Sequence, residues 1–245
     1  MIYWLDCDVN GADSIERLIK EGKVQHIVCD TFVAFEKAIV GLLPKVTPED
    51  LVIVDTVTSL ANTTRGDMKL GTDLTASLWD QRSIFFSDKN YLTVYEAAGQ
   101  SIMRRIKNLR ARGARIITVC HEDEQLDPAT LGKKRAPQVN EALYRSLLAA
   151  SSDVFRLYAL ADDELNQETG EVKYKADTRF LQLRNSEEAV AKFHVEREQV
   201  EKIPSRLSNP TLPRLYKALA KRPSWCLLYG PPGAGKTSLA VSEAS

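Results

Sequence analysis

The chain has 245 residues, of which 44% are apolar and 27% are charged, and its 33 basic and 33 acidic residues give a formal net charge of zero. This composition is that of an ordinary folded protein and excludes a mostly disordered chain. It also excludes a strong overall positive field, so any contact with nucleic acid has to be local. The length suits one α/β domain, or one such domain with an appendage.

The sequence predicts neither a membrane segment nor a secretory signal. No apolar run reaches the roughly 20 residues needed to cross a bilayer, and residues 1–6 lack the basic start and long apolar core of a signal peptide. We therefore expect a cytoplasmic protein, in the host cytoplasm if it is phage-encoded, without membrane contact. Four cysteines lie in or beside apolar runs without C-x-x-C spacing, which favours buried free thiols: Cys7, Cys29, Cys120 and Cys226.

The beginning of the chain predicts alternating strands and helices, the order of an α/β fold. Five segments carry these patterns: 2–6 (strand), 15–19 (helix), 24–29 (strand), 32–43 (helix) and 51–55 (strand). Asp8 follows the first strand closely, and Asp55 closes the third. Because ligands of open α/β sheets collect at the carboxyl ends of the strands, both aspartates are candidate site residues.

The run Leu51-Val-Ile-Val-Asp55 has the pattern of a Walker B strand. In a protein that also carries a P-loop, such a strand places its aspartate where the carboxylate can hold Mg²⁺ through water. The pattern alone is weak, since many apolar strands end in an aspartate that caps a helix or begins a turn. Its weight depends on a phosphate-binding loop elsewhere in the chain.

Residues 63–89 show no sustained periodicity and mix basic with aromatic side chains. Such a mixture can neutralise and stack on single-stranded nucleic acid, which makes Arg65, Lys69 and Arg82 candidate DNA contacts. Four aspartates balance the basic charges of this segment. A partly helical packing segment is therefore an equal alternative.

The next stretch predicts a long helix over 91–112 and a strand over 116–121. Six basic residues occur without an acidic one from Arg104 to Arg115, which we interpret as a solvated helix face in preference to a phosphate contact. The strand ends in His121, at the same sheet edge as Asp8 and Asp55. A histidine there has either a structural role or the role of reporting the γ-phosphate of a nucleotide.

Residues 122–139 predict a second long loop, which contains the basic run Lys133, Lys134 and Arg135. This run is able to meet phosphates, although a solvated surface is the default interpretation. Further elements follow at 142–150 (helix), 154–158 (strand), 168–171 (hairpin turn) and 178–184 (returning strand).

The strongest motif lies near the end of the chain, where the apolar run 225–229 enters a sequence that matches G-x-x-x-x-G-K-[ST] at every fixed position. Glycines allow the positive φ angles that turn backbone N–H groups onto phosphate oxygens, and a helix beginning at Thr237 adds a partial positive charge. Lys236 is expected to reach the β- and γ-phosphates, and Thr237 to bind Mg²⁺. The expected nucleotide-binding residues are Gly230, Pro231, Pro232, Gly233, Ala234, Gly235, Lys236, Thr237 and Ser238. An ordinary Gly-Pro turn with a chance lysine is the weaker alternative.

With these motifs in place, the chain resembles the RecA-like recombinase ATPases, and among them the small phage-type single-domain members. The resemblance rests on the P-loop, on the Asp55 strand running into Thr-Val-Thr-Ser-Leu, and on His121 where the family has a polar γ-phosphate sensor. It implies a single RecA-like ATPase domain over residues 1–245. Its fold would be an α/β P-loop NTPase core, with a mostly parallel sheet flanked by helices and an antiparallel hairpin extension.

The resemblance also implies an activity and partners. It predicts ATP hydrolysis with Mg²⁺, stimulated by single-stranded DNA, in recombination, annealing or repair. Asp8 corresponds to the acidic residue, usually Glu, that activates water, and His121 stands where Gln is common. Arg184 resembles the basic residue that reaches the ATP of a neighbouring subunit, which implies a homo-oligomer. The segments 63–89 and 122–139 correspond to DNA-binding loops, and a single-strand-binding or other replication or recombination protein is a further expected partner.

The order of the motifs differs from that of the family, in which the P-loop precedes the acidic, Walker B and sensor strands. Here the P-loop segment 209–245 follows the remainder of the core, 1–208, and only nine residues follow Lys236. A parallel crossover needs a dozen or more residues. We therefore expect a circularly permuted order, whether natural, engineered or produced by joining fragments. It predicts that Ser245 lies near Met1 and that strand 225–229 pairs directly with strand 51–55.

Two other functional classes remain open from the sequence. A P-loop kinase or other phosphotransferase would pass the phosphoryl group to an acceptor instead of water. A nucleotide-gated protein-interaction module would bind ATP without contacting DNA. Product analysis separates the first from an ATPase, and DNA titration separates the second from a DNA-dependent enzyme.

Overall fold

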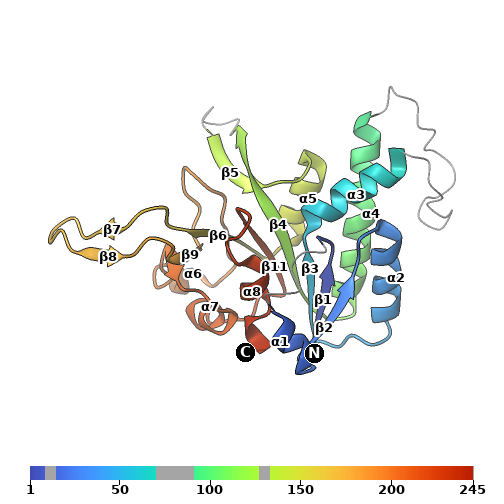
Figure 1. Cartoon of the computed structure of the whole chain (residues 1–245), viewed down its shortest axis with the longest axis horizontal. Helices are drawn as coiled ribbons and strands as arrows, with labels where there is room; N and C mark the ends of the chain where they lie inside the picture. The colour runs from blue at the N-terminus through green and yellow to red at the C-terminus, as the bar shows by residue number, and fades with distance from the viewer. Residues whose placement is uncertain (9–14, 70–90, 127–132, 245) are drawn as a thin grey trace.

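The computed structural model of the chain describes residues 1–8, 15–69, 91–126 and 133–244 (Figure 1). The strands of the main sheet are β1 (Ile2–Asp6), β2 (Val24–Val28), β3 (Leu51–Asp55), β4 (Arg115–Leu126), β5 (Lys133–Pro137), β6 (Asp153–Ala159), β9 (Arg179–Gln182), β10 (Arg206–Ser208) and β11 (Trp225–Gly230). The helices are α1 (Glu16–Lys20), α2 (Phe32–Leu42), α3 (Val57–Lys69), α4 (Tyr91–Ala111), α5 (Glu141–Ala150), α6 (Arg197–Val200), α7 (Leu212–Leu219) and α8 (Lys236–Ala240), followed by the 3₁₀ turn η2 (Ser242–Ala244). None of the helices in the described ranges combines the length and the hydropathy needed to span a membrane.

The strands follow the order β10-β9-β6-β11-β4-β3-β1-β2. All neighbours from β6 to β2 run parallel, whereas β9 and β10 are antiparallel additions at one edge. The strand β5 pairs antiparallel with the far half of β4. The prediction of an α/β fold with a mostly parallel central sheet flanked by helices is therefore confirmed.

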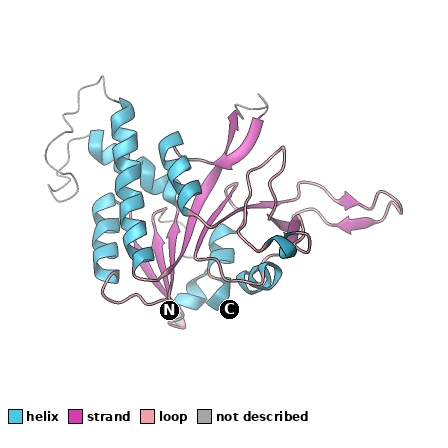
Figure 2. Cartoon of the chain, turned by 180° about the vertical axis from the view of Figure 1, so that it is seen from behind, coloured by secondary structure: helices cyan, strands magenta, loops and turns pink. Residues whose placement is uncertain are grey.

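The apolar runs of the sequence become strands because helices cover both faces of the sheet. Val52 and Val54 pack on the same side as the buried faces of α2, α4 and α5, while Leu51 and Ile53 pack on the side of α1, α7 and α8. The view from behind shows α2, α4 and α5 lined along the first of these faces (Figure 2). A strand buried on both faces has no polar side to alternate with, hence the continuous apolar sequence. All four cysteines are buried and free.

The P-loop strand does not lie beside the Asp55 strand, so that prediction was wrong. Instead, β4 lies between them, and it pairs with β11 through His121 opposite Gly230 and with β3 through Val119 opposite Asp55. Neighbouring strands are about 4.8 Å apart, so β11 and β3 are separated by roughly 10 Å. The loop after β11 crosses this distance and reaches Asp55. The intervening strand β4 places His121 at the same carboxyl end of the sheet.

Both segments expected to be long loops contain regular structure. The part of the first segment that the structure describes, 63–69, continues helix α3, while 70–90 lie outside the described residues. The second segment is mainly a hairpin of β4 and β5, with 127–132 outside the described residues. Its strands place Glu124 opposite Arg135, and opposite charges on facing residues stabilise a strand pair. Charge composition alone had suggested a solvated loop.

The hairpin turn expected at 168–171 joins β7 (Glu164–Leu165) and β8 (Val172–Tyr174), which form a separate two-stranded sheet. Figure 1 shows this hairpin as an arm that projects from the edge of the main sheet. The chain then returns through β9, which pairs antiparallel with β6. The antiparallel extension predicted for the fold is therefore present.

The two ends of the described chain lie beside the amino-terminal ends of the parallel strands, whereas the P-loop lies at their carboxyl ends. Met1 and Ala244 line the same cavity, and the ion pair of Arg115 with Glu243, at 2.8 Å, ties the end of the chain to the start of β4. Figure 1 shows the two termini side by side. The expected proximity of the ends holds for Ala244, while Ser245 itself lies outside the described residues.

Gly230, where β11 becomes the P-loop, provides a test of the packing. A Cβ atom there would stand 2.0 Å from the carbonyl oxygen of Leu157 on β6, a contact that only a backbone shift could relieve. We expect Gly230→Ala to lower the free energy of unfolding by roughly 2 kcal/mol or more, as overpacking does. Urea denaturation followed by circular dichroism measures this change.

Gly41 is the matched control, because it lies on α2 and a Cβ atom there meets no atom within 4 Å. Gly41→Ala is expected to raise the free energy of unfolding by about 0.5–1 kcal/mol through helix propensity. A Gly230→Ala protein with the wild-type denaturation midpoint would contradict the close approach of β11 and β6.

Candidate functional site

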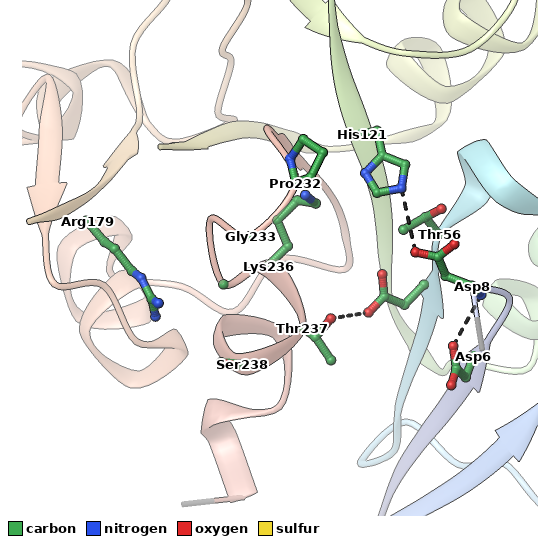
Figure 3. A pocket seen from close by; sticks show the side chains of 12 residues that line it. Asp6, Asp8, Thr56, His121, Arg179, Pro232, Gly233, Lys236, Thr237 and Ser238 are labelled. Atoms are coloured by element: carbon green, nitrogen blue, oxygen red, sulfur yellow. Dashed lines mark hydrogen bonds and ion pairs between the residues drawn. The ribbon is translucent and has the colours of Figure 1, made fainter. Parts of the chain in front are cut away.

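A cavity of about 370 Å³ opens at the carboxyl ends of the parallel strands. The ends of β1, β3 and β4 form one side, and the loop after β11 forms the other (Figure 3). Its lining residues are Asp6, Asp8, Asp55, Thr56, His121, Arg179, Pro232, Gly233, Gly235, Lys236, Thr237 and Ser238. The cavity thus brings together residues from both ends of the chain.

The loop has the curled backbone that the glycine pattern predicts. The φ angles are +75° at Gly233 and +89° at Gly235, so the expectation of positive φ is confirmed at these two positions. It was wrong for Gly230, whose φ is not positive and whose missing side chain is required by the close approach of β6. Helix α8 begins at Lys236 rather than at Thr237.

The Lys236 side chain lies inside the curl of its own loop. Its Nζ donates hydrogen bonds to the carbonyl oxygens of Gly230, at 3.0 Å, and of Pro231, at 2.8 Å. Burial lowers the pKa of Lys236, and the negative charge of Asp55 opposes this shift. The ammonium group therefore lies at the wall of the cavity, where phosphate oxygens can replace the loop carbonyls as its acceptors.

The hydroxyl of Thr237 donates a hydrogen bond of 2.5 Å to Oδ2 of Asp55, although the two residues are 182 positions apart in the chain. Asp55 is only 5% exposed. Burial raises the pKa of Asp55 to about 6, while the Thr237 hydrogen bond and the charge of Lys236 act against this rise. The peptide bond between Asp55 and Thr56 is cis.

The oxygen atoms of Thr237 and Asp55 fit a Mg²⁺ ion in chemistry, since this hard cation prefers oxygen ligands. Within the described ranges, no group of three or more His, Cys, Asp or Glu side chains could hold a metal ion. Mg²⁺ commonly takes one or two protein oxygens and completes its coordination with water and substrate phosphates. The pair is thus suited to a metal that arrives with a polyphosphate.

Asp8 and His121 face each other across the mouth of the cavity (Figure 3). Oδ1 of Asp8 accepts a hydrogen bond of 2.9 Å from Ser59, and its Oδ2 lies 3.7 Å from Nε2 of His121. Nδ1 of His121 is buried without a hydrogen-bond partner in the described part of the chain. Burial and the charge of Lys236 lower the pKa of His121, so the imidazole is neutral at pH 7 and keeps one donor and one acceptor nitrogen.

Asp6 is a site residue that the sequence reasoning did not select. It lies opposite Asp55 in the pairing of β1 with β3, and it is 1% exposed. Its Oδ2 lies 3.0 Å from Nε2 of His26, and its Oδ1 accepts a hydrogen bond from the backbone N–H of Asp8. The available signal was the carboxylate that closes the first apolar run, in the same way as Asp55 closes the third.

The arginine at the cavity is Arg179, which the sequence reasoning also missed. Its Nη1 lies 2.7 Å from the position that a Cβ atom of Gly235 would take, so the guanidinium lies against the loop. Arg184, selected through the resemblance, does not line the cavity, and its Nη2 donates to the carbonyl oxygens of Val200 and Ile203, both at 2.6 Å. The two arginines are on the same returning strand and its continuation, so spacing alone could not separate them.

The expected DNA contacts are only partly described. Lys133 and Arg135 both pair with Glu124, at 3.2 Å and 2.7 Å, while Lys134 is half-buried on the same strand. Two cations of the basic run therefore share one carboxylate within the hairpin. The side chains of Arg65 and Lys69 on α3 and the whole of Arg82 lie outside the described residues.

Replacing Asp55 by Asn removes a buried group that resists ionisation. Because the folded-state pKa is about 6 and the unfolded one about 3.9, the group stabilises the fold below pH 4, and this stabilisation is lost as the pH rises through 6. We expect Asp55→Asn to raise the free energy of unfolding of the nucleotide-free protein by roughly 1–3 kcal/mol at pH 8, and by less at pH 5. Urea denaturation at both pH values measures the difference.

Asp162→Asn is the control, since it makes the same change in formal charge at an exposed position. Its effect should stay within about 0.5 kcal/mol at both pH values. Equal destabilisation of the Asp55→Asn protein at pH 5 and pH 8 would show instead that the ionised carboxylate stabilises the fold.

The site combines a curled glycine loop, a buried lysine and a threonine that contacts a buried carboxylate from a distant strand. Comparison of the chain with protein-family models, with curated proteins and with solved structures gave no match. The functional interpretation therefore depends on the geometry of the site and on the motifs in the sequence.

Proposed function

We propose that the protein is a Mg²⁺-dependent ATPase with a RecA-like P-loop core. The observation that carries this proposal is the contact between Thr237 and Asp55, directly beside Lys236. A P-loop enzyme needs its loop lysine and hydroxyl within reach of one metal-positioning carboxylate. A chance Gly-Pro turn with a lysine gives no reason for this meeting of residues from opposite ends of the chain.

Each residue then has a distinct role in holding the reactants. The loop N–H groups and Lys236 bind the phosphates, and the oxygens of Thr237 and Asp55 hold the metal. Mg²⁺ supplies positive charge to the phosphate oxygens. Asp8, whose carboxylate is fixed on one side by Ser59, orients the attacking water, and the neutral His121 contacts the terminal phosphate. Catalysis consists of positioning and electrostatic stabilisation.

The charge of the cavity also favours a metal-bound nucleotide over a free one. Asp6, Asp8 and Asp55 place three carboxyl groups on one wall, against Lys236 and Arg179 on the other. A free polyphosphate would be repelled by the acidic wall, whereas a Mg²⁺ complex carries the compensating charge to it. This arrangement supports a nucleotide-metal complex as the substrate.

The arrangement of the strands supports the RecA-like assignment and the permuted order. The acidic strand β1, the Asp55 strand β3, the sensor-type strand β4 and the P-loop strand β11 lie side by side in that order, although β11 comes last in the chain. Assembly into a homo-oligomer remains a prediction from the resemblance.

Phosphate release from Mg²⁺-ATP, with and without single-stranded DNA, tests the enzyme. We expect Lys236→Ala to abolish turnover, because it removes the charge that contacts the phosphates, and Asp8→Asn to lower turnover while sparing nucleotide binding. Wild-type protein that releases no more phosphate than the Lys236→Ala protein would refute the proposal. Transfer of the phosphate to an acceptor other than water would identify a phosphotransferase instead.

We also propose single-stranded DNA as the partner, with the β4–β5 hairpin as a contact. Because Glu124 pairs with both Lys133 and Arg135, we expect Glu124→Gln to raise the affinity for an oligonucleotide and to steepen its salt dependence. Fluorescence anisotropy at low salt, with and without ATP, measures both effects.

The ion pairs of this hairpin also favour a second candidate, a protein-interaction ATPase without DNA contact. Absence of oligonucleotide binding by wild-type and Glu124→Gln proteins, in both nucleotide states, would favour that candidate. Glu141→Gln is a suitable control, because Glu141 pairs with Arg145 on the surface of α5.

A further inference from the structure

Arg179 stands at a fixed point above the P-loop of its own chain. It is the first residue of β9 and pairs with Ala159 of β6, the strand that also borders β11. Its carbonyl oxygen accepts a hydrogen bond of 2.7 Å from Asn209, and the next residue, Phe180, is buried. Hydrogen bonds therefore fix the backbone of Arg179 on both sides. Its side chain extends from this fixed backbone to Gly235.

The guanidinium of Arg179 differs in its partners from other arginines in this part of the fold. Arg156 pairs with Glu122, Arg206 pairs with Glu164, and Arg184 donates to two backbone carbonyls. For Arg179 no side-chain hydrogen bond or ion pair occurs with any residue in the described ranges. Its donors thus remain available beside an anion-binding loop.

We infer that Arg179 binds the phosphates of the nucleotide in cis, from the same chain that supplies the P-loop; this inference rests on the proposed function. Figure 3 shows Arg179 on one side of the loop, with Asp8 and His121 on the other. In this arrangement Lys236, inside the curl of the loop, and the guanidinium of Arg179, beside Gly235, contact the phosphates from two different directions. Arginine suits this position because its fork binds two phosphate oxygens at once.

The inference differs from the expectation for Arg184. An arginine supplied by a neighbour acts only when subunits assemble, whereas Arg179 reaches the loop within one chain. Arg184 is engaged with carbonyl oxygens 16 and 19 residues further along its own chain. The charge that stabilises the transferring phosphate therefore comes from the protomer that binds the nucleotide.

Kinetics of Arg179→Ala and Arg179→Lys test the role. We expect Arg179→Ala to lower kcat by on the order of 100-fold or more, since arginines that contact a transferring phosphate contribute at least this much. The lysine variant should recover only part of the loss, because it lacks the bidentate fork. Arg145→Ala, at an exposed ion pair on α5, should leave kcat and KM unchanged.

A mixing experiment separates action in cis from action in trans. Arg179→Ala and Lys236→Ala proteins are assayed alone and as an equimolar mixture over a range of concentrations. If Arg179 acts in cis, the mixture has only the sum of the separate activities. Restored activity in the mixture would overturn the inference, because an intact arginine would then be rescuing the loop of a neighbour.

Titration with a fluorescent ATP analogue in Mg²⁺ provides a readout independent of turnover. We expect Arg179→Ala to weaken binding of the triphosphate more than binding of the diphosphate. Wild-type binding and turnover by Arg179→Ala, with Lys236→Ala inactive, would overturn the inference and leave the proposed function standing. Wild-type protein that binds no nucleotide would overturn both.

Discussion

The site depends on one buried carboxylate at the end of a parallel strand. Asp55 loses most of its contact with water, and its hydrogen bond with Thr237 and the nearby charge of Lys236 compensate only in part, so its pKa stays raised. The sheet can hold such a group because the P-loop reaches it from two strands away. A metal ion bound there together with an anion would supply the positive charge that the buried carboxylate of Asp55 lacks. The fold thus gives up some stability where a ligand can restore it.

In contrast to Asp55, several charged groups near the β4–β5 hairpin are compensated by ion pairs within the fold. The basic run at 133–135 forms a positive patch in the sequence, yet in the hairpin Glu124 pairs with both Lys133 and Arg135. Arg156 is likewise paired with Glu122 at the root of the same hairpin. Arg179, in contrast, lines the cavity beside Gly235 without such a partner among the described residues. A charge run shows the composition of a segment, whereas only the facing strand shows whether the charge is available.

The strand β11, which leads into the glycine loop, is also tied to the hairpin that follows His121. The hydroxyl of Tyr229, one residue before the loop, donates to the carbonyl oxygen of Val190, at 2.6 Å, and lies 3.2 Å from that of Arg135 on β5. The backbone N–H of His121 donates to Thr58, whose hydroxyl donates to Gln138. These bonds connect the base of the hairpin to both β11 and α3. The base of the hairpin is thus anchored to two elements that border the cavity.

Local sequence determined the identity of most elements and the core of the site. Continuous apolar runs identified β1, β3 and β11, and the glycine pattern identified the loop with Lys236 and Thr237, because spacing along the chain encodes these features directly. The order of the strands was decided only by tertiary structure: β4 separates β11 from β3, since pairing between distant strands leaves no mark in local spacing. The same holds for Arg179, whose role depends on the pairing of β9 with β6, and for Asp6, whose place beside Asp55 follows from strand register. Sequence determined which chemistry the chain carries, and long-range packing decided which of its charged groups meet.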